Sequence, residues 1–399
     1  MAIGTPFHPR TAALCVSHAW RRWSGFLAAS SYGDFVAPEY AAIRNAAALI
    51  DVSPLYKYQV SGPDAAALLD RVVTNDVARL APGRALYTPW CDRDGRVRQD
   101  GTVFRLDQDR YLLNAAEPAG AWLAEAAHGL RASIEDRSRA LAALALQGPF
   151  SRDLLAALDG DGAVAGLRFF DLAAARLGGV PALVSRTGYT GDLGYEVWVE
   201  AERALDLWDA LAREGPRFGL TPCGLLALDV ARLEAGFLLL NVDYVSAEAA
   251  RVSADAVSPY TLGMGWAVKL DKGRFTGRDA LAAEKRRGTP ARVVGLEVPW
   301  DPIEALYLDE AGVMPDLPLL ACREPAPVYD PATGRQIGRA TTRVWSTLLK
   351  KYVALATLEA PWTAPGAEVG LEMTVHWRRR TAPARVAATP FFRPARARA

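Results

Sequence analysis

Cysteine and histidine are the side chains that most often bind metals or carry redox chemistry, and this sequence uses them sparingly. Its four cysteines lie far apart among 399 residues and form no CxxC pair: Cys15, Cys91, Cys223 and Cys322. No two of its four histidines have the spacing of metal ligands. We therefore expect neither a metal site nor a redox dithiol, and such isolated thiols suit a reducing compartment.

The charge balance favours a small-molecule partner. Lys plus Arg number 46 and Asp plus Glu number 45, so no strong field draws nucleic acid or an anionic membrane to the protein. Arginines cluster near the end of the chain without aromatic residues spaced to stack bases, and we interpret them as a solvated tail: Arg378, Arg379, Arg380, Arg393, Arg396 and Arg398. No stretch approaches the roughly 18 uninterrupted apolar residues of a membrane span, and we expect a cytoplasmic protein.

One strand-to-helix pattern occurs twice. The sequence from Leu55 to Val60 alternates, with Lys57 and Gln59 on the outer side, which predicts a half-buried strand. Gly62-Pro63 ends it, and leucines at helical spacing follow. The second copy has an apolar strand at 141–147, Gly148-Pro149 and another helix; the two turns are 86 residues apart (148 minus 62). This indicates two similar α+β modules, although Gly-Pro turns are common enough for chance to remain an alternative.

The remaining patterns divide the chain into two regions. Trp20 and Trp23 are three residues apart, which predicts one buried helix face. After Gly288 the sequence changes to short β-type runs broken by Pro and Gly. We therefore divide the chain into residues 1–288, with both α+β modules, and residues 289–399, a β-rich barrel or sandwich. Within the first region we expect a hairpin at 102–114, strands at 182–185 and 195–199, and helices at about 119–130, from 205, and at 223–235.

Seven phrases then follow one another in a specific order: DVSPLYKYQVSGPDAAALLDRVVTND, ALYTPWCDRDGRVRQDGTV, LALQGP, SRTGYTGDLGYEVWV, CGLLALDVARLEAG, GWAVKLDKGRFTGRDAL and TPFFR. From about Tyr40 to Arg393 the chain resembles the glycine-cleavage T-protein (aminomethyltransferase) family, whose relatives include folate-dependent demethylases. The resemblance implies an α+β fold, with a three-domain cloverleaf around a central folate channel and a C-terminal β-barrel-like domain. It also implies tetrahydrofolate as the cofactor.

The resemblance assigns roles to two acids and an amide. Asp100 matches the family's catalytic aspartate, where a carboxylate can position the reacting pterin nitrogen and stabilise developing charge. Glu196 matches the pterin-binding glutamate, whose two oxygens suit two parallel N–H donors. Asn114 matches an asparagine near the reacting carbon, although it could simply end its strand. Without the resemblance, Asp100 would be an exposed hairpin acid, and Glu196 would lie with Trp198 and Glu200 on the wet side of a strand.

Two tyrosines and an arginine complete the predicted cofactor site. Tyr87 and Tyr189 match folate-lining tyrosines whose rings can pack on the pterin or its benzoyl group; the alternative is that they are core aromatics. Arg232 could pair with a carboxylate of folate or substrate. It could equally pair with an internal acid, such as Asp229 or Glu234.

Three positions depart from the T-protein pattern. Pro54 replaces a histidine, Leu228 replaces an arginine, and Gln99 replaces the first of two adjacent acids. The first two changes make the inherited pocket more apolar, which favours a methylated molecule over an aminomethyl group on a lipoyl arm. We place three further residues in the substrate pocket, with the tryptophan as an aromatic wall: Leu55, Tyr56 and Trp90.

The sequence therefore predicts a tetrahydrofolate-dependent demethylase or methyltransferase. It would act on a small O-, N- or S-methylated substrate, form methyl-tetrahydrofolate, and need no lipoyl carrier protein. The first alternative is the aminomethyltransferase of the glycine cleavage system. The second is a non-catalytic folate-binding module, as in the iron–sulfur branch of this superfamily. The lysine-glycine-cysteine phrase of that branch is absent here, which argues against this alternative.

Overall fold

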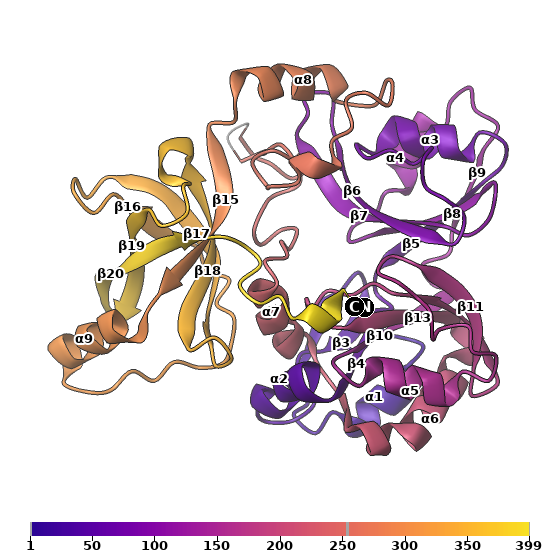
Figure 1. Cartoon of the computed structure of the whole chain (residues 1–399), viewed down its shortest axis with the longest axis horizontal. Helices are drawn as coiled ribbons and strands as arrows, with labels where there is room; N and C mark the ends of the chain where they lie inside the picture. The colour runs from indigo at the N-terminus through magenta and orange to yellow at the C-terminus, as the bar shows by residue number, and fades with distance from the viewer. Residues whose placement is uncertain (1, 253–254, 399) are drawn as a thin grey trace.

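The computed structural model describes residues 2–252 and 255–398. Its main parts are a five-stranded sheet, a six-stranded sheet and a closed six-stranded barrel. Figure 1 shows the barrel on the left and the two sheets, each with its helices, one above the other on the right. The predicted mixed α+β fold with a C-terminal barrel is confirmed. The domain boundary at residue 288 remains our proposal.

The first module is built on the five-stranded sheet, with strand order β6-β7-β8-β5-β9. Its strands are β5 (Tyr56–Ser61), β6 (Arg84–Cys91), β7 (Val97–Arg105), β8 (Arg110–Ala115) and β9 (Ser133–Asp136), and its helices are α3 (Ala65–Val72) and α4 (Gly120–Ala126). Gly62 has φ +117° at the turn into α3, and a Cβ there would lie 2.7 Å from the Arg131 carbonyl oxygen. A side chain is therefore excluded at this turn.

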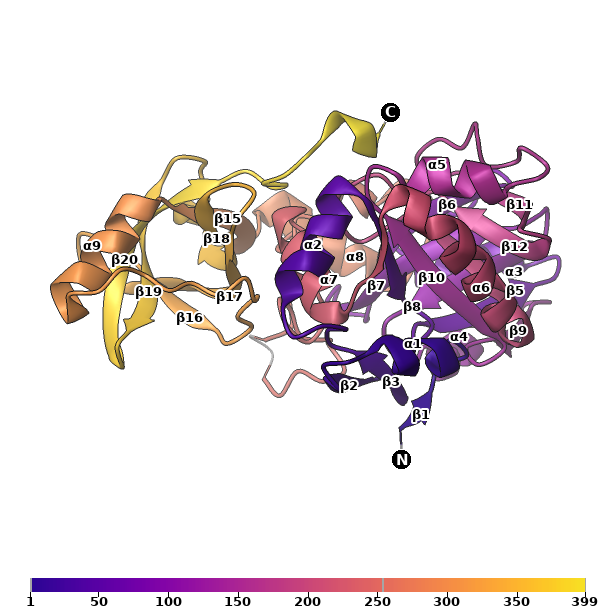
Figure 2. The ribbon, with the colours of Figure 1, turned by 90° about the horizontal axis from the view of Figure 1, so that it is seen from below.

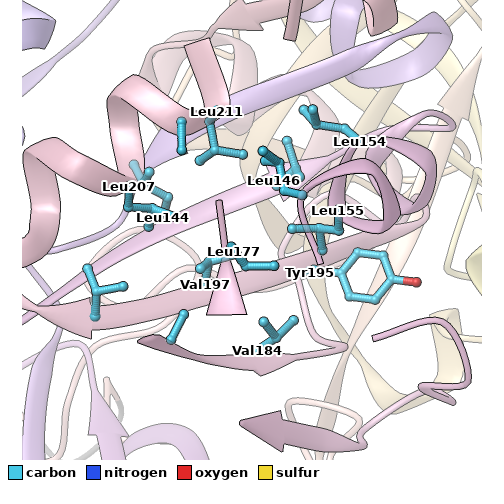
Figure 3. Close-up of a cluster of buried hydrophobic side chains, with 14 of the residues drawn as sticks. Leu144, Leu146, Leu154, Leu155, Leu177, Val184, Tyr195, Val197, Leu207 and Leu211 are labelled. Carbon is cyan, nitrogen blue, oxygen red and sulfur yellow. The ribbon is translucent and has the colours of Figure 1, made fainter. Parts of the chain in front are cut away.

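The second module is built on the six-stranded sheet, with strand order β11-β12-β13-β10-β4-β14. Its strands are β4 (Ala47–Asp51), β10 (Leu141–Gln147), β11 (Leu172–Leu177), β12 (Val180–Ser185), β13 (Gly194–Glu200) and β14 (Leu220–Pro222). Its helices are α2 (Val36–Asn45), α5 (Ser151–Leu158), α6 (Ala204–Glu214) and α7 (Leu225–Glu234). Figure 3 shows Leu144 and Leu146 of β10 packed with leucines of α5 and α6. Burying each such side chain stabilises the fold by about 1.5–3 kcal/mol.

The two sheets are joined by two crossovers. Residues 52–55, the first crossover, lead from β4 in the second module to β5 in the first. Residues 137–140, the second crossover, lead from β9 back to β10. The Phe104 ring of β7 meets the Trp198 ring of β13 edge-on, with 5.5 Å between centroids, so the sheets pack face to face.

This packing corrects the prediction for β5. The sequence predicted a half-buried strand with Lys57 on its outer side. Instead both faces are covered: Lys57 and Val60 are 0% exposed and Tyr58 is 3% exposed. The strand lies between β8 and β9, and the facing sheet covers the side that alternation assigned to solvent.

The barrel closes in the order β15-β18-β17-β16-β19-β20. Its strands are β15 (Ala291–Val298), β16 (Ala326–Tyr329), β17 (Gln336–Ser346), β18 (Lys351–Glu359), β19 (Glu368–Val375) and β20 (Arg378–Ala387). Helix α8 (Arg278–Arg287) precedes it, and α9 (Trp300–Ala311) is a helix that the sequence did not predict. Helix α9 has prolines near its start and a single buried residue, Ile303, so its sequence shows little helical periodicity.

The arginine-rich end is only partly a solvated tail: Arg378, Arg379, Arg393 and Arg398 are exposed, but the segment is anchored at several points. Arg378 and Arg380 belong to β20, and both pair with Glu310 of α9. The last segment leaves the barrel and crosses back to the modules, as Figure 2 shows. There Arg396 donates to Asp192 at 2.6 Å and 2.9 Å. The tail is thus anchored beside the loop that precedes β13.

The N-terminal residues form a small sheet rather than the predicted helix face. Trp20 and Trp23 lie at the ends of β2 (Trp20–Trp23), which pairs with β3 (Phe26–Ala29); β3 also pairs with β1 (Ile3–Gly4), and α1 (His8–Leu14) joins them. Short 3-10 turns occupy Ala201–Arg203, Gly215–Phe218, Gly265–Ala267, Ala360–Trp362 and Ala395–Ala397. Within the described residues, no helix is long and apolar enough to cross a membrane.

Candidate functional site

Strand register places several predicted site residues on one face of the five-stranded sheet. Tyr87 pairs with Thr102, Thr102 with Asn114, and Asn114 with Lys57. Directly opposite residues share a face, so these four side chains form a row across β6, β7, β8 and β5. Asp100 lies two residues from Thr102 and therefore projects from the same face. Phe104 of that face contacts the second module, so the whole row faces the other sheet.

Asp100 is held between two tyrosine hydroxyl groups. Tyr87 donates to its Oδ2 at 2.8 Å, and Tyr244 donates to its Oδ1. Burial raises the pKa of Asp100, while these two donors lower it. Burial and the neighbouring carboxylate raise the pKa of both tyrosines well above the ordinary value, so both stay neutral donors. Asp100 is thus a partly buried strand residue, and the exposed-hairpin alternative is wrong.

Tyr244 is a site residue that the sequence analysis missed. It follows Asp243, whose carboxylate accepts hydrogen bonds from the Thr341 and Thr342 hydroxyls of the barrel at 2.6 Å each. The backbone N–H of Leu239 also donates to Asp243, at 2.8 Å. The barrel therefore anchors the irregular segment that brings Tyr244 to Asp100. Such a segment has no periodicity from which its position could be predicted.

Glu196 projects from the second sheet. It pairs with Ala145 of β10 and Ser185 of β12, and its Oε2 accepts a hydrogen bond from Thr187 at 2.6 Å. Burial raises the pKa of its carboxyl group, and this donor opposes the shift. Trp198, on the same strand face, is 2% exposed, so the wet-side alternative is wrong. The Ser185 hydroxyl acts on the same carboxyl group as a second donor. Glu196 shares its strand face with Trp198, which contacts Phe104, and therefore faces the first module.

The loop between β12 and β13 carries Tyr189. Gln147 holds this loop: it accepts from Thr190 at 2.8 Å, and a Cβ on Gly188 would lie 2.2 Å from its Oε1. The Tyr189 ring stacks on Phe237 with 5.4 Å between centroids, and its hydroxyl donates to the Leu238 carbonyl. Burial raises the pKa of Tyr189, so its hydroxyl also stays neutral. The residue as a whole is partly exposed.

Asn114 contributes an unused acceptor. Its Nδ2 donates to Thr102 at 3.1 Å, but its buried Oδ1 has no hydrogen-bond partner among the described residues. A buried carbonyl oxygen without a partner costs free energy, about 1–3 kcal/mol, unless a ligand or water supplies a donor. This orphan acceptor, on the same face as Asp100, fits a ligand that carries N–H groups.

The structure corrects the role predicted for Arg232. Its Nε donates to Asp229 at 2.8 Å, its Nη1 to Asp243 and to the Phe237 carbonyl, and its Nη2 to Thr342 at 2.9 Å. The side chain is 1% exposed, and the neighbouring carboxylates raise its pKa despite burial. All three nitrogens therefore serve the junction with the barrel rather than a folate carboxylate. Glu234, the other acid considered, pairs with Arg44 instead.

Trp90 also departs from its predicted role. It is 1% exposed, belongs to the core of the first module, and would lie 3.3 Å from a Cβ on Gly101. It therefore supports the backbone beside Asp100 and offers no wall to a substrate. Trp266 is the exposed alternative: it is 59% exposed and stacks on Tyr87 with 5.9 Å between centroids.

The remaining predicted pocket residues lie at the first crossover. Leu55 ends that crossover and Tyr56 begins β5, and both are partly buried. Pro54 is buried, as is Leu228 on α7, so both departures from the T-protein pattern contribute apolar interior. Leu55 packs against the interior between the sheets and remains a candidate pocket residue. Tyr56 alternates with Lys57 and packs on the core of the first module, so it does not lie on the face that carries Asp100 and the structure does not support its predicted place in the pocket.

A separate cleft of about 730 Å³ lies on the barrel. None of the predicted site residues lines it. Its charged side chains are paired: Tyr329 donates to Glu372 at 2.8 Å, and Arg385 pairs with Glu368 at 3.3 Å. We therefore place the functional site between the two sheets and not in this cleft. Across residues 2–252 and 255–398, no group of three or more His, Cys, Asp or Glu is arranged to hold a metal.

Comparisons with known proteins identify relatives of the whole architecture. The model of the GCVT N-terminal domain matches residues 7–272, and that of the glycine cleavage T-protein C-terminal barrel domain matches residues 311–393. The chain is 38% identical over 369 residues to an aminomethyltransferase of Symbiobacterium thermophilum, covering 90% of this chain and 89% of the relative. It is 35% identical over 364 residues to an aminomethyltransferase of Streptomyces coelicolor, covering 89% of each.

The fold has a solved counterpart. The glycine cleavage system aminomethyltransferase T from Bartonella henselae matches with a TM-score of 0.80 and 23% identity, covering 98% of this chain and 99% of that one. The family models and the relatives together define a tetrahydrofolate-dependent transferase. The chain belongs to the glycine cleavage T-protein family, and the family predicted from its sequence phrases is confirmed.

Proposed function

We propose that this protein is an aminomethyltransferase, which transfers a one-carbon unit from an aminomethyl donor to tetrahydrofolate. The observation that carries the proposal is that two carboxylates project from facing sheets. Asp100, held by two tyrosine hydroxyls, projects from one sheet, and Glu196 projects from the other. The curated relatives of similar length named above are aminomethyltransferases, which supports this reaction over methyl transfer.

The residues present fit tetrahydrofolate, which supplies the nitrogens that accept the carbon. We assign Glu196 to the amino-pyrimidinone edge, where its two oxygens can accept from two N–H donors. The orphan Oδ1 of Asn114 is a further acceptor for an N–H group. Tyr87 and Tyr189 are partly exposed residues against whose rings a pterin or benzoyl ring can pack.

We assign Asp100 the movement of protons. Burial raises its pKa, which makes its carboxylate a better proton acceptor than an exposed aspartate. Two folate nitrogens each form a bond to the carbon and give up one proton, while the carbon loses its bonds to the amine nitrogen and to the carrier sulfur. Asp100 can accept these two protons one at a time and return one to each leaving group, so that the amine leaves as ammonia and the sulfur as a thiol. Tyr87 and Tyr244 fix both oxygens throughout. This orientation is the kind of preorganisation that lowers a barrier.

Methyl transfer remains the second candidate. The specific observation in its favour is that Pro54 and Leu228 are buried where polar groups were expected, and Trp266 exposes an aromatic face beside Tyr87. The sequence favoured this function partly through Trp90. With Trp90 in the core, that part of the argument is lost.

The products separate the two candidates. Purified protein is incubated with tetrahydrofolate and either an aminomethylated lipoyl carrier or a panel of methoxyaromatics, betaines and sulfonium compounds. We expect methylene-tetrahydrofolate and ammonia from the carrier and no methyl-tetrahydrofolate from the panel. Methyl-tetrahydrofolate from the panel, without product from the carrier, would establish demethylation instead.

A further inference from the structure

Lys57 is a fully buried cation, and the proposed reaction assigns it no role. It is 0% exposed, and among the described residues it makes no ion pair. Its ammonium group donates instead to three backbone carbonyl oxygens: Ser53 at 2.6 Å, Leu55 at 2.8 Å and Ser138 at 3.3 Å. Burying a lysine costs free energy unless its donors are satisfied, so this arrangement demands an explanation.

The three carbonyls belong to both connections between the sheets. Ser53 and Leu55 lie in the first crossover, and Ser138 lies in the second. The backbone N–H of Lys57 adds a fourth link, because it donates to the Ser138 hydroxyl at 3.0 Å. One side chain therefore fastens the two chain segments at which the modules are joined.

Lys57 also belongs to the row of site residues. It pairs in register with Asn114, and through Thr102 the same row reaches Tyr87. Its ammonium group lies 6.0 Å from the centroid of Trp198, two residues along β13 from Glu196. Lys57 therefore lies on the sheet face that carries Asp100, and its ammonium group lies close to the strand that carries Glu196.

We propose that Lys57 is a positioning residue that fixes the spacing between the two sheets, so that Glu196 and Asp100 engage the same folate molecule. This inference rests on the proposed function, since it takes folate to bind between the sheets. A pterin bound by Glu196 can contact Asp100 only if the two sheets are held at one particular distance from each other. A misplacement of about 1 Å can lower an enzymatic rate by about a hundredfold.

The direct test replaces Lys57 by methionine, which keeps the stem and removes the three donors. Lys272 offers a control, because its side chain is also buried and donates to three backbone carbonyls: Asp70 at 2.7 Å, Val73 at 2.7 Å and Asn75 at 2.6 Å. It differs from Lys57 in also pairing with the Asp70 carboxylate at 3.0 Å. Those carbonyls all lie within the first module and outside both crossovers. Both variants should lose thermal stability.

The two variants should differ in folate binding and turnover. We expect Lys57→Met to weaken tetrahydrofolate binding about tenfold by calorimetry and to lower kcat at saturating folate by a further tenfold or more. Lys272→Met should stay within about twofold of the parent in both. Equal effects of the two variants would overturn the proposal and leave Lys57 as one buried hydrogen-bonding group among others.

A double-mutant cycle tests the route of the effect. If Lys57 acts by placing Glu196 against the pterin, Lys57→Met should weaken binding much less in a Glu196→Gln background. Multiplicative losses would contradict the proposal. If the parent protein itself does not bind tetrahydrofolate, the proposed function fails; if the parent and Glu196→Gln behave as expected but Lys57→Met does not, only this inference fails.

A pH titration of the unaltered protein covers the case in which Lys57→Met does not fold. Burial lowers the pKa of Lys57 to about 8, and the charged groups acting on it are Asp51 of β4 and Asp136 of β9, which favour the cation. Folate affinity should therefore fall as pH rises through about 8. The hydroxyls of Tyr87, Tyr189 and Tyr244 stay protonated there, because their pKa values are raised.

The Lys272→Met variant should show the same fall in affinity as the parent, because Lys272 also has a lowered pKa but does not join the sheets. An affinity that is flat between pH 7 and 9 in the parent would contradict the proposal.

Discussion

Replacing Tyr244 by phenylalanine tests whether the barrel-anchored segment serves Asp100. The change removes one of the two hydroxyl donors to that carboxylate and leaves Tyr87 at 2.8 Å. A hydrogen bond to a charged group contributes about 1.5–3 kcal/mol, and we take the lower end because Asp100 is only partly buried. Since about 1.4 kcal/mol is a factor of ten in rate, we expect kcat to fall about tenfold.

The pH dependence should change in a defined direction. The Tyr244 hydroxyl lowers the pKa of Asp100, opposing the rise caused by burial. Without that donor the pKa rises further, a smaller fraction of Asp100 is ionised at a given pH, and the acid limb of the rate profile moves to higher pH. The assay is kcat against pH, with tetrahydrofolate affinity measured alongside.

Tyr329→Phe is the matched control. It also removes a tyrosine hydroxyl from a carboxylate, that of Glu372 at 2.8 Å, but in the barrel. It should leave kcat and the acid limb unchanged. If Tyr244→Phe behaves like this control, Tyr244 takes no part in the site, and the claim that Tyr87 and Tyr244 together hold the Asp100 carboxylate is wrong.

Three further substitutions have distinct signatures. Asp100→Asn should lower kcat by roughly a hundredfold while tetrahydrofolate affinity by calorimetry stays within about threefold; unchanged turnover would remove Asp100 from the chemistry. Trp90→Ala should lower the free energy of unfolding by about 3–5 kcal/mol in denaturant titration, and a stable variant with altered substrate preference would return Trp90 to the pocket. Arg232→Met leaves the buried carboxylates of Asp229 and Asp243 without this partner, so the free energy of unfolding should fall by about 3–5 kcal/mol. Unaltered stability with lost folate binding would instead favour a ligand role for Arg232.

Periodic elements of the fold could be predicted from the sequence. Strand β10 has the predicted bounds, Leu141–Gln147, because a fully apolar run ended by Gly-Pro leaves few alternatives. Helix α4 ends at Ala126 rather than near residue 130. Helix α9 escaped prediction because it packs through Ile303 and has prolines in and before its first turn. Helical periodicity reveals a helix only when one whole face is buried.

Some site residues could be predicted from the sequence and others could not. Asp100 and Glu196 could be found because phrases around them match a family, and the structure sets them on facing sheets. Tyr244 could not, since tertiary contacts alone bring an irregular segment to Asp100. Lys57 was assigned to the outer side of its strand because alternation describes one sheet and carries no information on a second sheet packed against it. Trp90 was placed in the pocket because it is close to Tyr87 in the sequence, but its side chain projects from the opposite face of β6 into the core of the first module.

The central claim is that tetrahydrofolate binds between the two sheets with Glu196 on its pterin edge. Calorimetric titration of tetrahydrofolate into the parent, Glu196→Gln and Glu372→Gln tests it most directly, because Glu372 lines the separate cleft on the barrel. Loss of a charge-assisted pair worth about 1.5–3 kcal/mol should weaken binding to Glu196→Gln by roughly ten- to a hundredfold, with Glu372→Gln equal to the parent. Undiminished affinity in Glu196→Gln, or weakened affinity in Glu372→Gln alone, would contradict the account.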